Sequence, residues 1–401
     1  AVEAVGLEWV GEWDIDEIEP FDDFYVLDSK NKPTKKPLGG RIFLSLGNEA
    51  GLNDLLSLWE TWKQGKPLPH GKSKWADVFA QLIDIRRWGI LETLRETGMI
   101  DRWQDFVDPL APEQKISFQI ELFYRSNSQV RKQNEKTIIF LLNSIGGSIL
   151  SNFIDMPEIG FHAVKADLPA GMILQLLKSV ENPNSGIDID LFKFQGIMYF
   201  RPTGQSLVAS GDEEGEPMGF PKGGGDLPPV GALLDGVPLL QHDALRDRLY
   251  FDDAFDLEPL YLPGERKHGT SMASLILHGD LNSLGEPLNR KVYCIPIMQP
   301  DPKSQHRNEH IPDEVFFEDR VFIAVRRMLE GDGALPPQAP DVKVVNLSIG
   351  DNERPFIHTP SPWARLLDWL SWKYRILFCV SAGNYSDTID LEMNYPEFSE
   401  L

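Results

Sequence analysis

The feature that most limits the fold of this chain is an alternation of short apolar runs and amphipathic stretches from residue 229 onward. The apolar runs predict buried strands at Val230–Leu234, Val292–Met298, Val342–Leu347 and Ile376–Ser381. The stretches between them predict helices at Thr270–Leu277, Val315–Leu329 and Trp363–Tyr374. Apolar strands separated by helices are typical of a parallel sheet covered on both faces, so we predict an α/β domain over residues 229–401.

A smaller α+β domain of ferredoxin-like type is predicted for residues 111–203. It begins with a strand in which apolar residues from Ile116 to Tyr124 alternate with polar ones. The pattern then predicts a helix at Gln129–Ile145, a strand at Phe161–Ala166, a helix after Pro169 and a strand at Ile187–Phe200. The order is therefore strand, helix, strand, helix, strand.

Two further regions complete the predicted organisation. Residues 1–110 are expected to be mostly helical, with helices at Asn53–Trp62 and along the Trp-rich stripe Trp75–Thr97, and their role is unknown. Residues 204–228 contain Gly-Asp-Glu-Glu-Gly-Glu-Pro and Lys-Gly-Gly-Gly-Asp, which are too polar and glycine-rich to form a core. We predict a flexible linker there, either a site of processing or a passive tether.

Composition excludes several classes of function. The formal net charge of −22 repels phosphate backbones, so we expect no nucleic-acid partner. No apolar run approaches the roughly 20 residues of a membrane span, and the N-terminus lacks the pattern of a signal peptide. The sequence does not begin with Met, which leaves open a trimmed N-terminus that carried a leader. Cys294 and Cys379 both lie in apolar runs, which predicts buried free thiols and a cytoplasmic location.

Three polar residues lie where an α/β sheet presents functional side chains. Asp235 follows the first apolar run, and His268 opens a predicted helix in the motif His-Gly-Thr-Ser-Met-Ala-Ser. A carboxylate beside an imidazole orients the ring and stabilises its cation. Asn384 ends the motif Ser-Ala-Gly-Asn after the last apolar run, and its side-chain amide can donate to a developing oxyanion.

These motifs resemble those of the subtilase family of serine proteases, which carry Asp, His and Ser in that chain order. The resemblance implies a subtilisin-like sheet in which Asp235 orients His268, His268 is general base and then acid, and Asn384 stabilises the oxyanion. It departs from the family at Gly236, because the family usually places Ser or Thr directly after the Asp. The missing hydroxyl leaves the local hydrogen bonding open.

The resemblance extends to the substrate site and to the smaller domain. Asn-Leu-Ser-Ile-Gly, at the end of the strand Val342–Leu347, resembles the family's substrate-binding segment, whose backbone pairs with an extended peptide. Ser348, Ile349 and Gly350 are therefore implied to form the substrate wall. The pattern of residues 111–203 resembles the prodomain-like inhibitor domain that precedes many subtilases.

The family's nucleophile motif, Gly-Thr-Ser-x-Ala-x-Pro, does not follow Asn384. Ser271 lies in a partial match, but it sits on the same helical turn as His268 and lacks the final Pro, so we predict that it is not the nucleophile. We expect the nucleophilic Ser outside this chain, in a truncated or cleaved C-terminal segment or in a companion chain. The alternative is a pseudoprotease that binds peptides or regulates a partner without cleavage.

The implied partner is a protein or peptide substrate. No pair of histidines shows zinc-ligand spacing with cysteines. Subtilases often bind Ca²⁺, so the resemblance leaves Ca²⁺ open as a cofactor, although no compact carboxylate loop in the sequence is assigned to it. The stretch Gln299–Asp313 is expected to be a polar surface insertion.

Overall fold

The structure is a computed structural model that describes residues 7–20, 24–47, 49–82, 89–107, 109–181, 189–203, 219–220, 225, 227–281, 286–304, 307–350 and 359–381. The chain divides into two compact units, Ala1–Glu92 and Thr93–Leu401. The predicted linker 204–228 lies almost entirely outside the described residues.

The first unit combines a strand pair with helices. Strands β1 (Leu7–Ile18) and β2 (Leu38–Gly47) pair antiparallel, so the expectation of a mostly helical N-terminal region is wrong for these residues. Helix α1 (Glu49–Lys63) contains the predicted helix Asn53–Trp62. The predicted helix Trp75–Thr97 is instead divided, into α2 (Trp75–Phe79) and α3 (Ile90–Arg95), and residues 83–88 lie outside the described part.

Aromatic packing gives this first unit its core. Trp75 and Phe79 of α2 are buried against α1, with Phe79 lying 5.2 Å from the ring of Trp59 and 6.0 Å from that of Trp62. Large rings bury much apolar area at little cost in side-chain entropy. Trp75 and Phe79 of the Trp-rich stripe therefore belong to the core of this unit.

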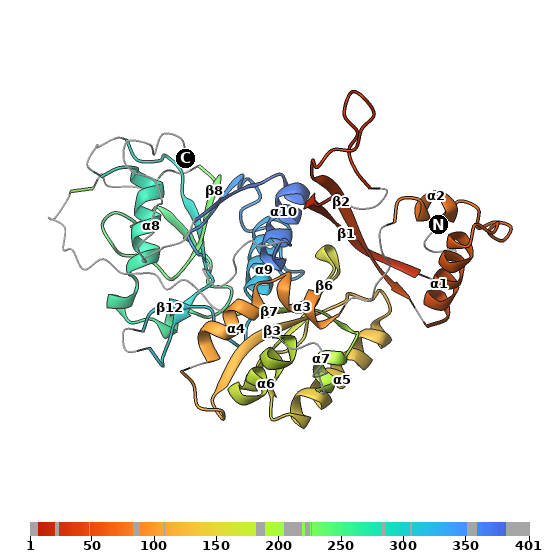
Figure 1. Ribbon diagram of the computed structural model, residues 1–401. Helices are drawn as coiled ribbons and strands as arrows, with labels where there is room; N and C mark the ends of the chain where they lie inside the picture. Colours follow the sequence, from red (N-terminus) through yellow and green to blue (C-terminus); the bar gives the residue numbers. More distant parts are fainter. Residues whose placement is uncertain are drawn as a thin grey trace, which may run out of the picture. The chain divides into compact units, whose positions relative to one another are not determined.

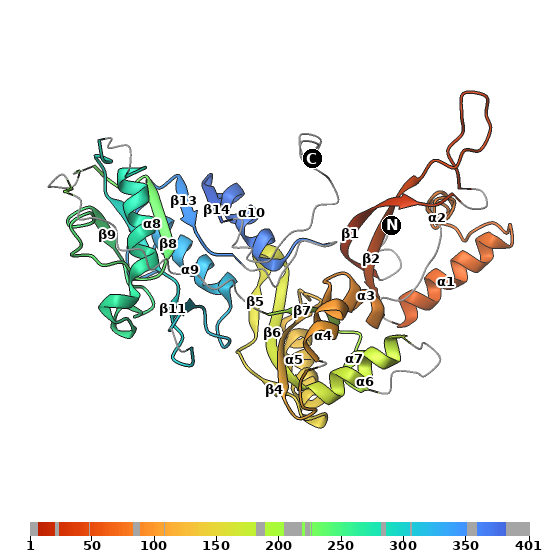
Figure 2. The ribbon, with the colours of Figure 1, turned by 60° about the vertical axis from the view of Figure 1, so that its left-hand side comes forward.

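The second unit begins with a five-stranded antiparallel sheet and its helices. The strands run in the order β4-β6-β3-β7, and a further strand, β5, pairs with β6. Its elements are α4 (Met99–Val107), β3 (Lys115–Leu122), α5 (Ser128–Ser144), β4 (Ser148–Ile149), β5 (Ile154–Met156), β6 (Phe161–Pro169), α6 (Ala170–Glu181), α7 (Asp190–Lys193) and β7 (Ile197–Pro202). Chain order is thus β-α-β-β-α-β with short additions, and Figure 2 shows α5 and α6 on the same side of this sheet.

The predicted elements of this domain are found, with one correction. Strands β3 and β6 and helices α5 and α6 lie where the alternation and the proline at position 169 indicated. The predicted strand Ile187–Phe200 is wrong in its first part, because α7 occupies residues 190–193 and the strand begins only at Ile197. The cause is physical: a short amphipathic turn buries Leu191 and Phe192 before the strand.

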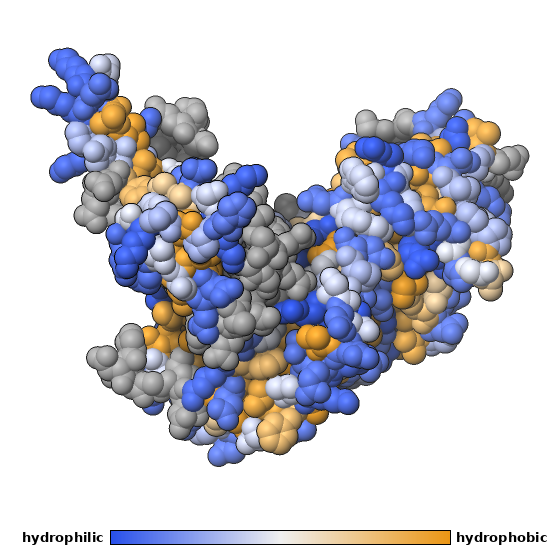
Figure 3. Space-filling view, turned by 90° about the vertical axis from the view of Figure 1, so that its right-hand side faces the viewer, coloured by the Kyte–Doolittle hydropathy of each residue, from blue (hydrophilic) through white to orange (hydrophobic). Residues whose placement is uncertain are grey.

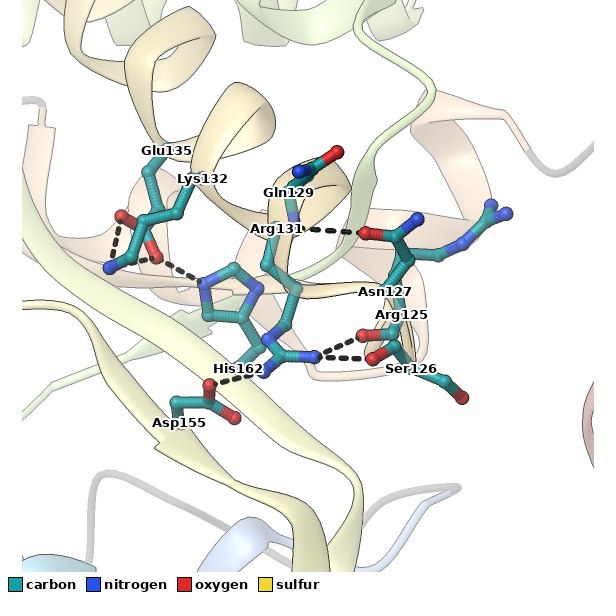
Figure 4. Close-up of polar contacts among 9 residues, drawn as sticks. All are labelled: Arg125, Ser126, Asn127, Gln129, Arg131, Lys132, Glu135, Asp155 and His162. Atoms are coloured by element: carbon teal, nitrogen blue, oxygen red, sulfur yellow. Dashed lines mark hydrogen bonds and ion pairs between the residues drawn. The ribbon is translucent and has the colours of Figure 1, made fainter.

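Polar contacts fix the start of α5 against the sheet, as Figure 4 shows. The Asn127 side chain caps the helix by accepting from the backbone N–H of Gln129 at 2.9 Å. One turn later, Arg131 forms an ion pair with Asp155 at 2.8 Å. Glu135 contacts Nε2 of the fully buried His162 at 3.2 Å and also accepts from Lys132 at 3.0 Å.

Five parallel strands form the second sheet, in the order β14-β13-β8-β10-β9. The strands are β8 (Gly231–Asp235), β9 (Leu249–Phe251), β10 (Val292–Pro296), β13 (Val344–Leu347) and β14 (Leu377–Val380). The helices are α8 (Lys267–His278), α9 (Phe317–Leu329) and α10 (Pro362–Tyr374), with single turns η4 (Glu258–Leu260) and η5 (Pro263–Glu265) before α8. The prediction of an α/β domain with a parallel sheet is confirmed, and β9 is an addition to it.

Helices cover both faces of this sheet because side chains of a strand alternate between faces. Leu233 and Cys294 pack in one cluster with Ala273 and Leu277 of α8. Their neighbours on β8 and β10 point the other way, into a cluster with α9 and α10 that contains Ala232, Leu234, Tyr293, Ile295, Val321, Leu366 and Leu370. Figure 1 shows α8 on one side of β8 and α9 with α10 on the other.

The antiparallel sheet contacts α9 and α10 on their outer side. Phe161 of β6 meets Phe316 edge to face at 5.9 Å, and Lys165 donates to the backbone oxygen of Val315 at 2.9 Å. The fully buried Glu121 of β3 is paired with Arg201 at 2.5 Å and with Arg365 of α10. These two arginines hold the pKa of Glu121 below its usual value although burial acts in the opposite direction.

The described part of β14 leaves apolar side chains exposed, namely Leu377 and Val380. Cys294 is buried as predicted, whereas the prediction that Cys379 is buried is wrong, because β14 is the outermost described strand.

The face drawn in Figure 3 intermixes hydrophobic and hydrophilic residues. No helix among the described residues has both the length and the apolarity needed to cross a membrane.

Candidate active site

Asp235 and His268, predicted as a pair from their motifs, lie together at one end of the parallel sheet. Asp235 is the last residue of β8 and is fully buried. His268 is the second residue of α8, and its Nδ1 lies 2.7 Å from Oδ1 of Asp235. The His268 side chain is 19% exposed, and Nε2 is the ring nitrogen that does not contact Asp235.

The residues around His268 explain why the pair forms. A Cβ on Gly269 would lie 2.5 Å from the backbone oxygen of Gly236, so only glycine allows α8 to approach the end of β8 this closely. The Thr270 hydroxyl accepts from the N–H of Leu239 at 2.8 Å and donates to the carbonyl of Arg266. These contacts fix the start of α8 and hence the direction of the imidazole.

A third residue, Glu309, completes the site and was missed by the sequence analysis. It lies on β12 (Glu309–His310), which pairs with β11 (Gln299–Pro300) in a short hairpin. The three residues Asp235, His268 and Glu309 each place one ring nitrogen or carboxylate oxygen in a cluster whose atoms lie within 4.8 Å of one another. The stretch 299–313 was expected at the surface, and this is wrong for Glu309 and Ile311, which are 7% and 2% exposed.

The unusual Gly236 makes room for Glu309. A Cβ at position 236 would lie 1.7 Å from Oε1 of Glu309 and 2.8 Å from the Tyr261 hydroxyl. The Tyr261 hydroxyl also donates to the backbone oxygen of Met298 at 2.9 Å and contacts the Glu309 carboxyl. Gly236 is thus the one sequence signal that could have indicated an additional group beside Asp235.

The electrostatics of the site are those of buried acids without basic partners. Among the described residues, no lysine or arginine forms an ion pair with Asp235 or Glu309. Burial, together with the charge of Asp235, raises the pKa of Glu309 to about 7. Burial alone would lower the pKa of His268, but its hydrogen bond with the Asp235 carboxylate outweighs burial and the pKa is raised.

The same three side chains are the group able to hold a metal ion in the described part of the chain. One imidazole and two carboxylates suit a divalent cation such as Zn²⁺. However, the 2.7 Å separation of Nδ1 and Oδ1 is that of a direct hydrogen bond, which an ion between these atoms would break.

The predicted substrate segment follows β13, which pairs with β8, so both strands end at the same edge of the sheet. Ser348 is half-buried and donates to Oδ1 of Asn346 at 2.7 Å. Gly350 is half-buried, whereas the Ile349 side chain is buried in the core on the side of α9 and α10. Any substrate contact of Ile349 is therefore through its backbone.

Two other predicted positions have different outcomes. Asn384 lies outside the described residues, so its place relative to His268 stays a prediction. Ser271 is exposed on α8, and within the described residues its side chain forms no hydrogen bond with His268. That Ser271 is not the nucleophile therefore stays a prediction.

Two comparisons with known proteins found no match for this chain. No protein-family model matches it, and no curated protein matches it either. The function is therefore argued from the site alone.

Proposed function

We propose that this protein is a subtilisin-like serine endopeptidase. The observation that carries the proposal is the 2.7 Å contact between Nδ1 of His268 and the fully buried Asp235, at the carboxyl end of a parallel strand. This edge is where open α/β sheets present functional groups. An imidazole anchored through Nδ1 offers Nε2 to a nucleophile, as in serine hydrolases.

In the proposed reaction, Nε2 of His268 accepts the proton of a serine hydroxyl as the serine attacks the peptide carbonyl carbon. Asp235 stabilises the imidazolium that forms and keeps the ring in its productive tautomer. His268 then gives the proton to the leaving amine, and the C–N bond breaks to leave an acyl-enzyme. Water hydrolyses this ester with His268 again as base, which regenerates the serine.

Two further groups belong to the proposal. The side-chain amide of Asn384 donates to the oxyanion of the tetrahedral intermediate, and the corresponding interaction in subtilisin, from which the value is carried over, contributes on the order of 3–4 kcal/mol. The nucleophilic serine comes from a polypeptide segment outside residues 1–401. The substrate is an extended peptide whose backbone pairs with that of Ser348–Gly350.

The antiparallel domain supports the same assignment. Its β-α-β-β-α-β chain order is ferredoxin-like, which is the type expected for residues 111–203. It contacts α9 and α10 through Phe161, Lys165 and Glu121. We therefore propose that residues 111–203 assist or inhibit the peptidase domain.

Fluorophosphonate labelling of the native protein, followed by mass spectrometry of the labelled peptide, tests the proposal. The probe reacts with activated serines, and the expected result is a single adduct on a serine that depends on His268. An adduct on Ser271 would refute the assignment of the nucleophile. Absence of any adduct on correctly folded protein would refute the peptidase and favour the non-catalytic peptide-binding module.

A further inference from the structure

Two buried carboxyl oxygens at the site have no hydrogen-bond partner among the described residues. They are Oδ2 of Asp235 and Oε1 of Glu309, and both side chains are more than nine-tenths buried. An isolated ionised carboxylate is very costly in such surroundings, and two adjacent ones repel each other. An oxygen of Asp235 and an oxygen of Glu309 lie within 4.8 Å of each other, and a proton on one of the two groups removes one of the two charges.

The position of Glu309 explains how the site works without the usual residue after its Asp. The family usually carries Ser or Thr there, whereas this chain carries Gly236. Oε1 of Glu309 occupies the space that the side chain of residue 236 would fill, since a Cβ there would be 1.7 Å away. The Glu309 carboxyl thus occupies the position in which a Ser or Thr hydroxyl at residue 236 would lie beside Asp235.

We propose that Glu309 is a positioning residue that stays protonated and donates a hydrogen bond from Oε1 to Oδ2 of Asp235. The bond fixes the Asp235 carboxylate while Oδ1 holds Nδ1 of His268. No covalent bond is made or broken, and Glu309 keeps its proton during the reaction at a pH below its pKa of about 7. The catalytic consequence rests on the proposed function, but the hydrogen bond does not.

The groups facing Glu309 favour its neutral form. Asp235 on β8 and Glu265 on η5 are acidic and oppose its ionisation, whereas His268 on α8 and the Tyr261 hydroxyl favour it. From the other elements, Cys294 of β10 is a buried thiol beside Asp235 whose pKa is raised by burial, and Arg320 of α9 is directed to the oxygen of Ile297. The balance agrees with the raised pKa of Glu309, about 7.

The test compares Glu309→Gln with Glu309→Met in the native protein, together with the segment that supplies the nucleophilic serine. Gln keeps the shape and a permanent N–H donor toward Oδ2, whereas Met keeps the volume and has no donor. At pH 6, we expect Gln to retain peptidase activity within about threefold and Met to lose about tenfold to a hundredfold, the loss of one hydrogen bond to a charged group. As the pH rises from 6 to 9, the unsubstituted protein loses the Glu309 proton that donates to Asp235, whereas Gln keeps its N–H donor. The ratio of Glu309→Gln activity to unsubstituted activity should therefore rise over this pH range.

A second pair of variants tests the shared space. Gly236→Ser should lower activity because its side chain meets Oε1 of Glu309, and Gly236→Ser combined with Glu309→Ala should recover it, since a hydroxyl can then act from position 236. Failure of the double variant to exceed the single one, with both folded, would refute the shared-space argument.

NMR titration of the His268 imidazole provides a readout that does not depend on catalysis. The unsubstituted protein should show two coupled steps, and Glu309→Gln a single step. A single step in both proteins would overturn the proposal, as would tight binding of one equivalent of Zn²⁺ that Glu309→Gln abolishes, since a cation would then replace the proton. Absence of peptidase activity alongside the two-step titration would refute the proposed function and leave the hydrogen bond established.

Discussion

Two histidines in the second unit contact carboxylates, and they differ in what surrounds them. In the antiparallel domain, Nε2 of His162 lies 3.2 Å from Glu135, its ring is fully buried, and Glu135 also binds Lys132 (Figure 4). At the end of the parallel sheet, Nδ1 of His268 lies 2.7 Å from Asp235, and the His268 ring is partly exposed. Among the described residues, no lysine or arginine pairs with Asp235.

The difference shows that a histidine–carboxylate contact alone does not define an active site. Burial lowers the pKa of His162 despite its contact with Glu135, so the ring is a neutral part of the core. The pKa of His268 is raised because Asp235 favours the cation, which is the form that a general base passes through. Partial exposure of the ring and a carboxylate that has no lysine or arginine partner among the described residues distinguish His268 from His162.

The largest expected effect separates these two histidines. His268→Gln should lower peptide hydrolysis by at least about 10⁴-fold, because the serine loses its base. His162→Gln is the matched control and should retain activity within a few-fold at a temperature where it is folded. Equal losses in both variants, measured as initial rates on an unfolded protein substrate, would contradict the distinction.

Arg365→Ala tests the antiparallel domain without touching the site. Removing one of two arginines from the buried Glu121 should destabilise the second unit by about 3 kcal/mol, measured by urea unfolding. Arg326→Ala is the control, because Arg326 forms an exposed ion pair with Glu330 at 3.3 Å and should cost less than about 1 kcal/mol. Similar costs for both variants would show that Glu121 does not depend on Arg365.

Thr270→Val examines how the start of α8 is held. The substitution removes the acceptor of the Leu239 N–H while preserving the shape of the side chain, and should cost about 1 kcal/mol of stability. The rate of hydrolysis should fall a few-fold because His268 is less well oriented. Unchanged stability and rate would mean that Gly269 alone fixes the helix.

The smallest expected effect is a difference in pH dependence between the two histidines. Because the pKa of His162 is lowered, its contribution to stability is present above the unfolded pKa of about 6.5 and is lost as the pH falls. Because the pKa of His268 is raised, its contribution is present below about 6.5 and is lost as the pH rises through the folded pKa. Urea unfolding of both Gln variants from pH 5 to 8 should give stability differences of opposite slope, and equal slopes would contradict the assignment.

The sequence predicted those parts of the fold that local pattern determines. Apolar runs located β8, β10, β13 and β14, and motif order brought Asp235 and His268 together. The pairing of β1 with β2 was missed because it depends on contacts between distant residues in a segment without clear periodicity. Strand β9 was missed because Leu249–Phe251 is too short to show a pattern.

Glu309 could not be predicted because its burial is a tertiary effect. It lies in a polar stretch, and only the β11–β12 hairpin brings it beside Asp235. The sequence shows Gly236 at the position where the subtilases, which its motifs resemble, usually carry Ser or Thr, but it does not show that Glu309 fills the space beside that glycine. Glu309 fills the space beside Gly236, and because the two residues are far apart in the sequence, only the three-dimensional structure shows that they are neighbours.

The rate of fluorophosphonate labelling in Asp235→Asn and in the unsubstituted protein tests the central claim most directly. The account predicts that Asp235→Asn folds normally but labels at least about 10³-fold more slowly at pH 7, because Asn fixes the wrong imidazole tautomer. Labelling at equal rates on the same serine would show that Asp235 and His268 do not activate it, and would contradict the proposed site.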